Sequence, residues 1–164
     1  MFNRQSGALE QLDVFAQTTC FHVETTSECH CPDLVAEHGA GFAIRDRWIA
    51  CKGWRSWVDD NSPTSWTQFS FDGFYEGAKH LIGGTQQPGF RIIENAYNLR
   101  IVSIDQIVRA IPAPDDVCSN LGWASGSPAL EVKRLMTDSD GQAVVHAHSI
   151  HIWSAVSIQM KINI

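Results

Sequence analysis

Three of the chain's seven histidines lie close together, at His146, His148 and His151. Near neutral pH an imidazole can bind a metal ion, transfer a proton or hydrogen-bond a ligand. The surrounding residues, VVHAHSIHIW, are typical of a β-strand, in which successive side chains point to opposite faces. His146 and His148 are therefore predicted on one face and His151 on the other, so the three do not form one cluster.

Two metal sites can be considered. His146 and His148 could share a zinc ion from one strand face, but the sequence identifies no third ligand. The Cys29-His30-Cys31 run is spaced more tightly than the cysteine pairs of structural zinc sites. We therefore predict no metal and no other cofactor, and leave the histidine pair as an open alternative.

Arg45 and Arg47 are the strongest candidates for binding an anion. On a strand predicted over residues 41–51 they share one face, and guanidinium groups bind carboxylate and phosphate through paired hydrogen bonds. Alternatively, they pair with nearby aspartates on the surface, which would leave them no role in binding. These aspartates are Asp46, Asp59 and Asp60.

The composition excludes several functional classes. The 164 residues carry a net charge of −6 and no cluster of basic residues, so the chain is not expected to grip nucleic acid by itself. No apolar run approaches the ~20 residues of a membrane-spanning helix, and no signal peptide is recognisable. Five cysteines cannot all be paired in a disulfide framework. A soluble, cytoplasmic protein is expected.

The elements that would position these residues alternate between strands and short helices, which predicts an α+β domain with a mostly antiparallel sheet. A strong hairpin signal lies at Asp138-Ser139-Asp140-Gly141. A second hairpin is predicted with its turn at Cys51-Lys52-Gly53. The predicted strands are 17–25, 41–51, 54–60, 100–111, 128–137, 142–153 and a closing strand in 155–164, and the predicted helices lie within 26–39, 64–84, 86–98 and 114–123.

The C-terminal half resembles the UTRA domain, the effector-sensing part of HutC-type regulators in the GntR family. The shared features are a Leu-Gly pair, a Gly-x-Pro, an apolar strand ending in arginine, a turn containing Asp-Gly and a strand with a small residue at its centre. In this chain they are Leu121-Gly122, Gly126-Ser127-Pro128, the strand ALEVKR, Asp140-Gly141 and Ser149.

The resemblance implies a chorismate-lyase-like fold, a six-stranded antiparallel sheet with helices packed on it and a small-molecule cavity between them. It implies a domain over residues 17–164 after a linker at 1–16, a homodimer, and operator DNA bound only through an N-terminal winged helix that this chain lacks. The effector would be a small anionic metabolite. The ligand-binding residues it implies are Arg45, Arg47, Asp59, Ser149 and His151.

The effector class can be narrowed because Val145 stands where many relatives place an acidic residue. This substitution favours a small carboxylate over a sugar phosphate. We predict no catalytic residues and no enzymatic activity. Two alternatives stay open: a lyase acting on chorismate-like substrates, and a metal-dependent hydrolase that uses His146 and His148.

Overall fold

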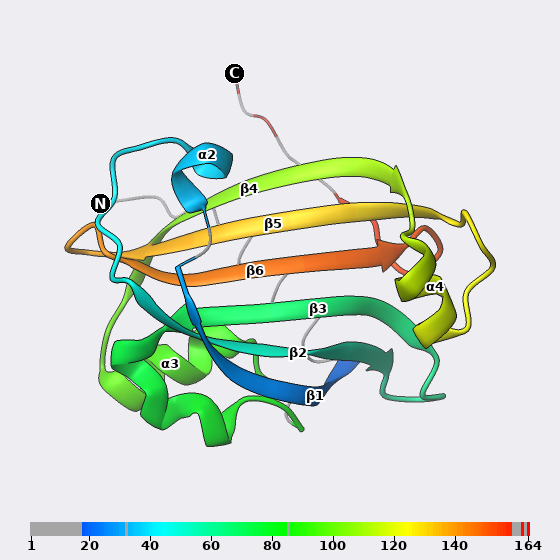
Figure 1. The fold of residues 1–164 in the computed structure, drawn as a ribbon, viewed down its shortest axis with the longest axis horizontal. Coiled ribbons are helices and arrows are strands. Elements are labelled where there is room, and N and C mark those ends of the chain that lie inside the picture. The colour runs from blue at the N-terminus through cyan, green and yellow to red at the C-terminus, as the bar shows by residue number, and fades with distance from the viewer. Residues whose placement is uncertain (1–17, 32, 85, 159–161, 163) are drawn as a thin grey trace.

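The computed structural model describes residues 18–31, 33–84, 86–158, 162 and 164. Its centre is one six-stranded sheet in the order β1-β2-β3-β6-β5-β4, with every neighbouring pair antiparallel (Figure 1). This confirms the predicted α+β fold. The elements are β1 (Thr19–His30), α2 (Leu34–His38), β2 (Arg47–Trp57), β3 (Pro63–Asp72), the 3-10 helix η1 (Gly73–Leu81), α3 (Gly89–Tyr97), β4 (Ile101–Pro112), α4 (Asp115–Leu121), β5 (Pro128–Asp138) and β6 (Ala143–Ile152). The predicted linker at 1–16 lies outside the described residues.

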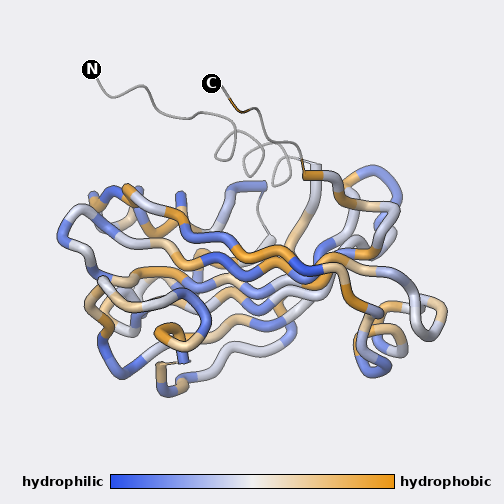
Figure 2. Tube along the Cα trace, turned by 90° about the horizontal axis from the view of Figure 1, so that it is seen from above, coloured by the Kyte–Doolittle hydropathy of each residue, from blue (hydrophilic) through white to orange (hydrophobic). Residues whose placement is uncertain are grey.

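Helices cover both faces of the sheet, and the strand period of two decides which side chains each helix meets. Hydrophobic and hydrophilic segments accordingly alternate along the strands (Figure 2). One face, here called the α3 face, packs against η1 and α3, and the other, the α2 face, lies under α2 and α4. From β6, the α3 face carries Val145, Ala147, Ser149 and His151, and the α2 face carries His146, His148 and Ile150.

The predicted hairpin within residues 41–60 is wrong, because β2 runs without interruption through Cys51, Lys52 and Gly53. Position 53 requires glycine for a reason other than a turn. A Cβ atom at this position would lie 1.9 Å from the backbone oxygen of His22, beside the bulge in β1 between Val23 and Thr25. Glycine therefore marks a close approach of two backbones within the sheet.

The prediction for residues 26–39 is correct only in its last turn. β1 continues to His30, and the helix α2 covers just Leu34–His38. The N-cap of α2 is Asp33. The predicted closing strand is also absent from the described part of 155–164, where 156–158 have no regular structure. In the described chain, no helix has the length and apolar character needed to cross a membrane.

Replacing Asp33 with alanine should loosen α2. The Asp33 Oδ1 atom accepts a hydrogen bond of 3.2 Å from the backbone N–H of Ala36, and N-cap side chains typically contribute ~1 kcal/mol. We expect the free energy of unfolding, measured by urea denaturation, to fall by about that amount. Asp33→Asn is the matched control and should keep most of the stability. An equal loss in both variants would contradict the capping role.

Candidate ligand-binding site

A cavity opens on the α3 face between the centre of the sheet and the chain around the start of α3. Its lining combines aromatic and aliphatic side chains with a few polar side chains, which is the usual composition of a small-molecule site. The apolar lining consists mainly of Phe21, Phe69, Phe90, Ile82, Ile92 and Met136. The polar lining side chains are Arg55, Thr67, Gln87, Arg134, Ser149 and His151.

Strand register brings polar groups from distant parts of the sequence together. Ser149 of β6 is aligned with Thr67 of β3, and their hydroxyl oxygens lie 3.1 Å apart. His151 is aligned with Ser65, which is itself aligned with Arg55 of β2. Four strands, β2, β3, β6 and β5, therefore supply the polar end of the cavity.

The two arginines make this cavity electrically positive. The Arg55 Nη1 donates to Thr19 Oγ1 at 3.2 Å, and the Arg134 Nε donates to Gln106 Oε1 at 2.6 Å. Burial lowers the pKa of each to about 10, and the charge of Arg55 contributes to the lowering at Arg134. Both guanidinium groups are still charged at pH 7, and none of the described lining residues is acidic. Such a site favours an anion.

His151 is a neutral partner in this group. Burial, followed by the charges of Arg134 and Arg55, lowers its pKa to about 3. At neutral pH its ring therefore carries one N–H donor and one acceptor nitrogen. It can hydrogen-bond a ligand without adding a third positive charge.

Ser149 and His151 both line the cavity, and their contact with an effector stays a prediction. Asp59 lies elsewhere, in a shallow surface hollow with Trp57 and Asp60. Arg55 and Arg134 were not predicted from the sequence. Arg134 ends the strand ALEVKR, and this position in the UTRA pattern could have marked it as a candidate. Arg55 was missed because the predicted hairpin put it on a strand separate from residues 41–51, whereas both belong to the continuous strand β2.

Arg45 and Arg47 do not line this cavity. Arg45 Nη1 lies 2.6 Å from the buried carboxylate of Asp72. Arg47 pairs with Glu28 at 2.7 Å and with Glu76 at 2.5 Å. Both arginines thus have acidic partners, as the alternative interpretation required, although the partners are not the aspartates named there. Their part in ligand binding stays a prediction, and this geometry does not support it.

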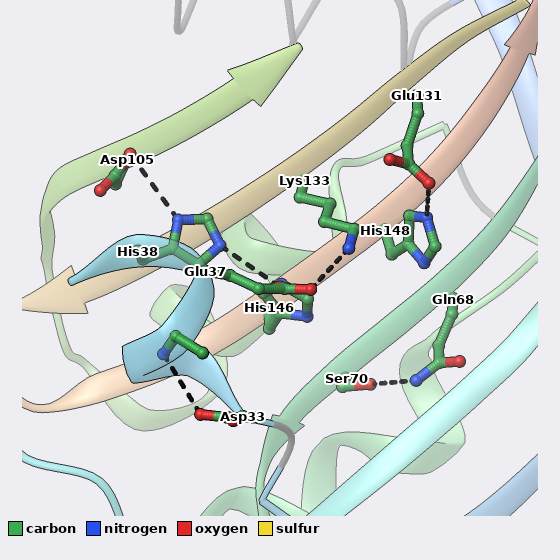
Figure 3. Close-up of polar contacts among 11 residues, drawn as sticks. Asp33, Glu37, His38, Gln68, Ser70, Asp105, Glu131, Lys133, His146 and His148 are labelled. Atoms are coloured by element: carbon green, nitrogen blue, oxygen red, sulfur yellow. Dashed lines mark hydrogen bonds and ion pairs between the residues drawn. The ribbon is translucent and has the colours of Figure 1, made fainter. Parts of the chain in front are cut away.

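His146 and His148 share the α2 face but have different neighbours (Figure 3). His148 Nε2 lies 3.0 Å from Glu131 Oε2, and its ring meets Trp66 edge-on. His146 instead faces Glu37 and His38 of α2. The pair is therefore divided between two environments, which does not favour a shared hydrolytic metal site.

Comparisons with known proteins agree with this architecture. Residues 82–157 match the model of the UTRA domain. No curated protein matches the sequence. The possible transcriptional regulator YydK from Bacillus subtilis superposes with a TM-score of 0.73 at 12% identity, over 92% of this chain and 64% of YydK. This chain therefore spans less than two thirds of that protein.

Two isolated regulator domains give similar results. The ligand-binding domain of a putative GntR-family regulator from Bordetella bronchiseptica has a TM-score of 0.71 and 16% identity, covering 88% of this chain and 92% of that one. The C-terminal domain of the histidine utilization repressor from Pseudomonas syringae gives 0.69 and 18%, covering 88% and 99%. The resemblance to the UTRA domain is thus confirmed over residues 82–157, and the described sheet has the fold of these regulator domains.

Proposed function

We propose that this chain is the effector-binding domain of a GntR-type transcriptional regulator, and that its effector is a small anion bound in the cavity on the α3 face. The observation that carries the proposal is the pairing of two charged arginines, Arg55 and Arg134, in a partly apolar cavity whose described lining contains no acid. The UTRA match and the shared fold support the regulatory role.

A small carboxylate with an apolar or aromatic body fits this lining best. The arginines would bind the carboxylate, since charge-assisted hydrogen bonds from guanidinium are the strong ones. Ser149 and His151 would supply further hydrogen bonds, and the aromatic side chains would cover the apolar body. Val145 is fully buried in the core cluster and offers no acid for sugar hydroxyls.

The regulatory mechanism follows from linkage. An effector that binds one arrangement of the regulator more tightly shifts the population toward it, and operator affinity changes by the same coupling free energy. We place the DNA contacts in a winged helix outside this chain, and propose that the regulator acts as a homodimer in the cytoplasm. Arg45 and Arg47, which pair with Asp72, Glu28 and Glu76, have no part in the proposed effector site.

We propose a binding role without catalysis. A lyase on this fold needs an acid in the cavity beside the arginines, and the lining residues that the structure describes include no carboxylate. Incubation with chorismate should therefore release no pyruvate. Release of pyruvate at a rate proportional to protein concentration would favour the lyase.

A thermal-shift screen tests the binding proposal. A ligand present at 100 times its Kd stabilises a protein by about 2.7 kcal/mol, which corresponds to a rise in Tm of roughly 5–10 °C for a chain of this size. We expect such a rise with small aromatic or aliphatic carboxylates and none with the corresponding amides, which lack the charge. Equal shifts with acid and amide would contradict an anion site.

A further inference from the structure

Glu37, His38 and His146 form a second cluster of polar groups on the α2 face, away from the effector cavity (Figure 3). The side chain of His38 is 0% exposed and that of His146 is 7% exposed. Both ring nitrogens of His38 and Nε2 of His146 are buried without a hydrogen-bond partner in the part of the chain that the structure describes. Buried polar atoms in native proteins are nearly always paired, so the two unpaired Nε2 atoms of His38 and His146, both near Glu37 Oε2, call for a ligand.

The distances suit a metal ion. Glu37 Oε2 lies 3.4 Å from His146 Nε2 and 3.9 Å from His38 Nε2, and the three ligand atoms all lie within 4.8 Å of one another. Around a tetrahedral zinc ion with bonds of about 2.0–2.2 Å, ligand atoms are about 3.3 Å apart. Small rotations of these side chains would close that difference. Glu37 is exposed, so an ion could reach the cluster from the side of this carboxylate.

The surroundings resemble those of known metal-binding histidines, which usually direct their second nitrogen at a carboxylate. His38 Nδ1 lies 3.7 Å from Asp105 Oδ1, on the side opposite Glu37. The remaining Glu37 oxygen, Oε1, accepts a hydrogen bond of 2.5 Å from Lys133 Nζ. Lys133 thereby orients the carboxylate, although its charge opposes a nearby cation and limits the affinity.

The protonation states of Glu37 and His146 are also compatible with this geometry. Burial lowers the pKa of His146 to about 4, although Glu37 acts in the opposite direction, so the ring is neutral at pH 7. Burial raises the pKa of Glu37, but Lys133, His146 and His38 together hold it below its ordinary value. Neither group then has to lose a proton for a metal to bind at neutral pH.

We propose that Glu37, His38 and His146 bind one divalent transition-metal ion of the zinc type, which ties α2 to β6. Two imidazoles and one carboxylate suit zinc and its neighbours in the first transition row, and do not suit magnesium or calcium, which require oxygen ligands. The effector cavity lies on the other face of β6, so the two sites are independent. The sequence alone places His146 and His148 on one strand face and identifies no third ligand, so it predicts no metal.

The test is zinc binding by the whole chain after treatment with EDTA. We expect equilibrium dialysis with metal analysis to find one zinc ion per chain with a Kd in the micromolar range or below, and zinc to raise Tm. Absence of stoichiometric zinc binding would overturn the proposal. Cobalt(II) should give a spectrum of nitrogen and oxygen ligation, without the sulfur charge-transfer bands of a thiolate site.

Matched variants locate the ion. Glu37→Gln, at an exposed position where folding is not at risk, should weaken zinc binding at least tenfold, and His38→Gln and His146→Gln should abolish it. His148→Gln, two residues along the same strand face, should bind zinc like the wild type. The double variant Cys29→Ser, Cys31→Ser should also bind normally. Zinc binding that persists in Glu37→Gln and His38→Gln but disappears without these thiols would assign the ion to the cysteines and refute the proposal.

Discussion

Replacing Arg134 with alanine is expected to reduce the affinity for an anionic effector by two to three orders of magnitude. Truncating one partner of a buried, hydrogen-bonded charge pair costs about 2–5 kcal/mol, and each ~1.4 kcal/mol is a tenfold change in Kd. The same variant should unfold at the same temperature as the wild type or higher when no effector is present. The reason is that Arg55 and Arg134 repel each other in the cavity. Isothermal titration with the best carboxylate from the thermal-shift screen measures the first effect.

Arg47→Ala is the matched control for Arg134→Ala. Arg47 pairs with Glu28 and Glu76 near the surface and does not line the cavity, so its loss should change Kd less than twofold. This comparison also decides between the two sets of arginines. A large loss in Arg47→Ala with normal binding by Arg134→Ala would move the anion site to the strand region that the sequence favours.

Acidification should destabilise the protein through His151. Its pKa is lowered to about 3 in the folded chain, by burial and by the two arginines, against an ordinary value near 6.5 in the unfolded chain. Between these two pKa values the unfolded chain binds more protons than the folded chain, so the free energy of unfolding rises with pH. The stabilising contribution of His151 is therefore lost as the pH falls below about 6.5. The slope from this group approaches about 1.4 kcal/mol per pH unit, which gives a loss of about 2–3 kcal/mol between roughly pH 6.5 and 4.5.

Urea denaturation at a series of pH values checks this prediction. His151→Asn removes the titrating ring while keeping hydrogen-bonding atoms, so its stability should change less with pH over the same window. The difference between the two curves isolates His151 from the other groups that titrate in acid. Parallel curves for wild type and variant would show that His151 does not stay neutral in the folded protein.

The sequence predicted best those features that depend on neighbouring residues. The β5–β6 hairpin follows from the Asp-Gly turn, and Gly141 indeed adopts a positive φ of 75°. Strand alternation correctly separated His151 from His146 and His148. The face on which a strand residue lies depends on whether its position is odd or even, and this does not require knowing which strands lie beside it. The same alternation put Ser149 and His151 together on one face, and that face lines the cavity.

What the sequence could not predict depends on contacts between distant segments. Gly53 looks like a turn residue until β1 is seen to approach its backbone. Arg45 appears available for a ligand until Asp72, 27 residues away, is seen to pair with it. Arg55 and His151 meet in one cavity only through the register of β2, β3 and β6. His38 gains importance in the same way, when α2 folds over β6.

The cavity between Arg55 and Arg134 is central to the proposed function, because it would hold the small anion. A crystal structure of the protein with its best-stabilising carboxylate tests this most directly. We expect carboxylate oxygens within hydrogen-bonding distance of both guanidinium groups, with the Ser149 hydroxyl and the His151 ring against the same ligand. A carboxylate bound instead at Arg45 and Arg47, with the cavity holding only water, would contradict the proposed site.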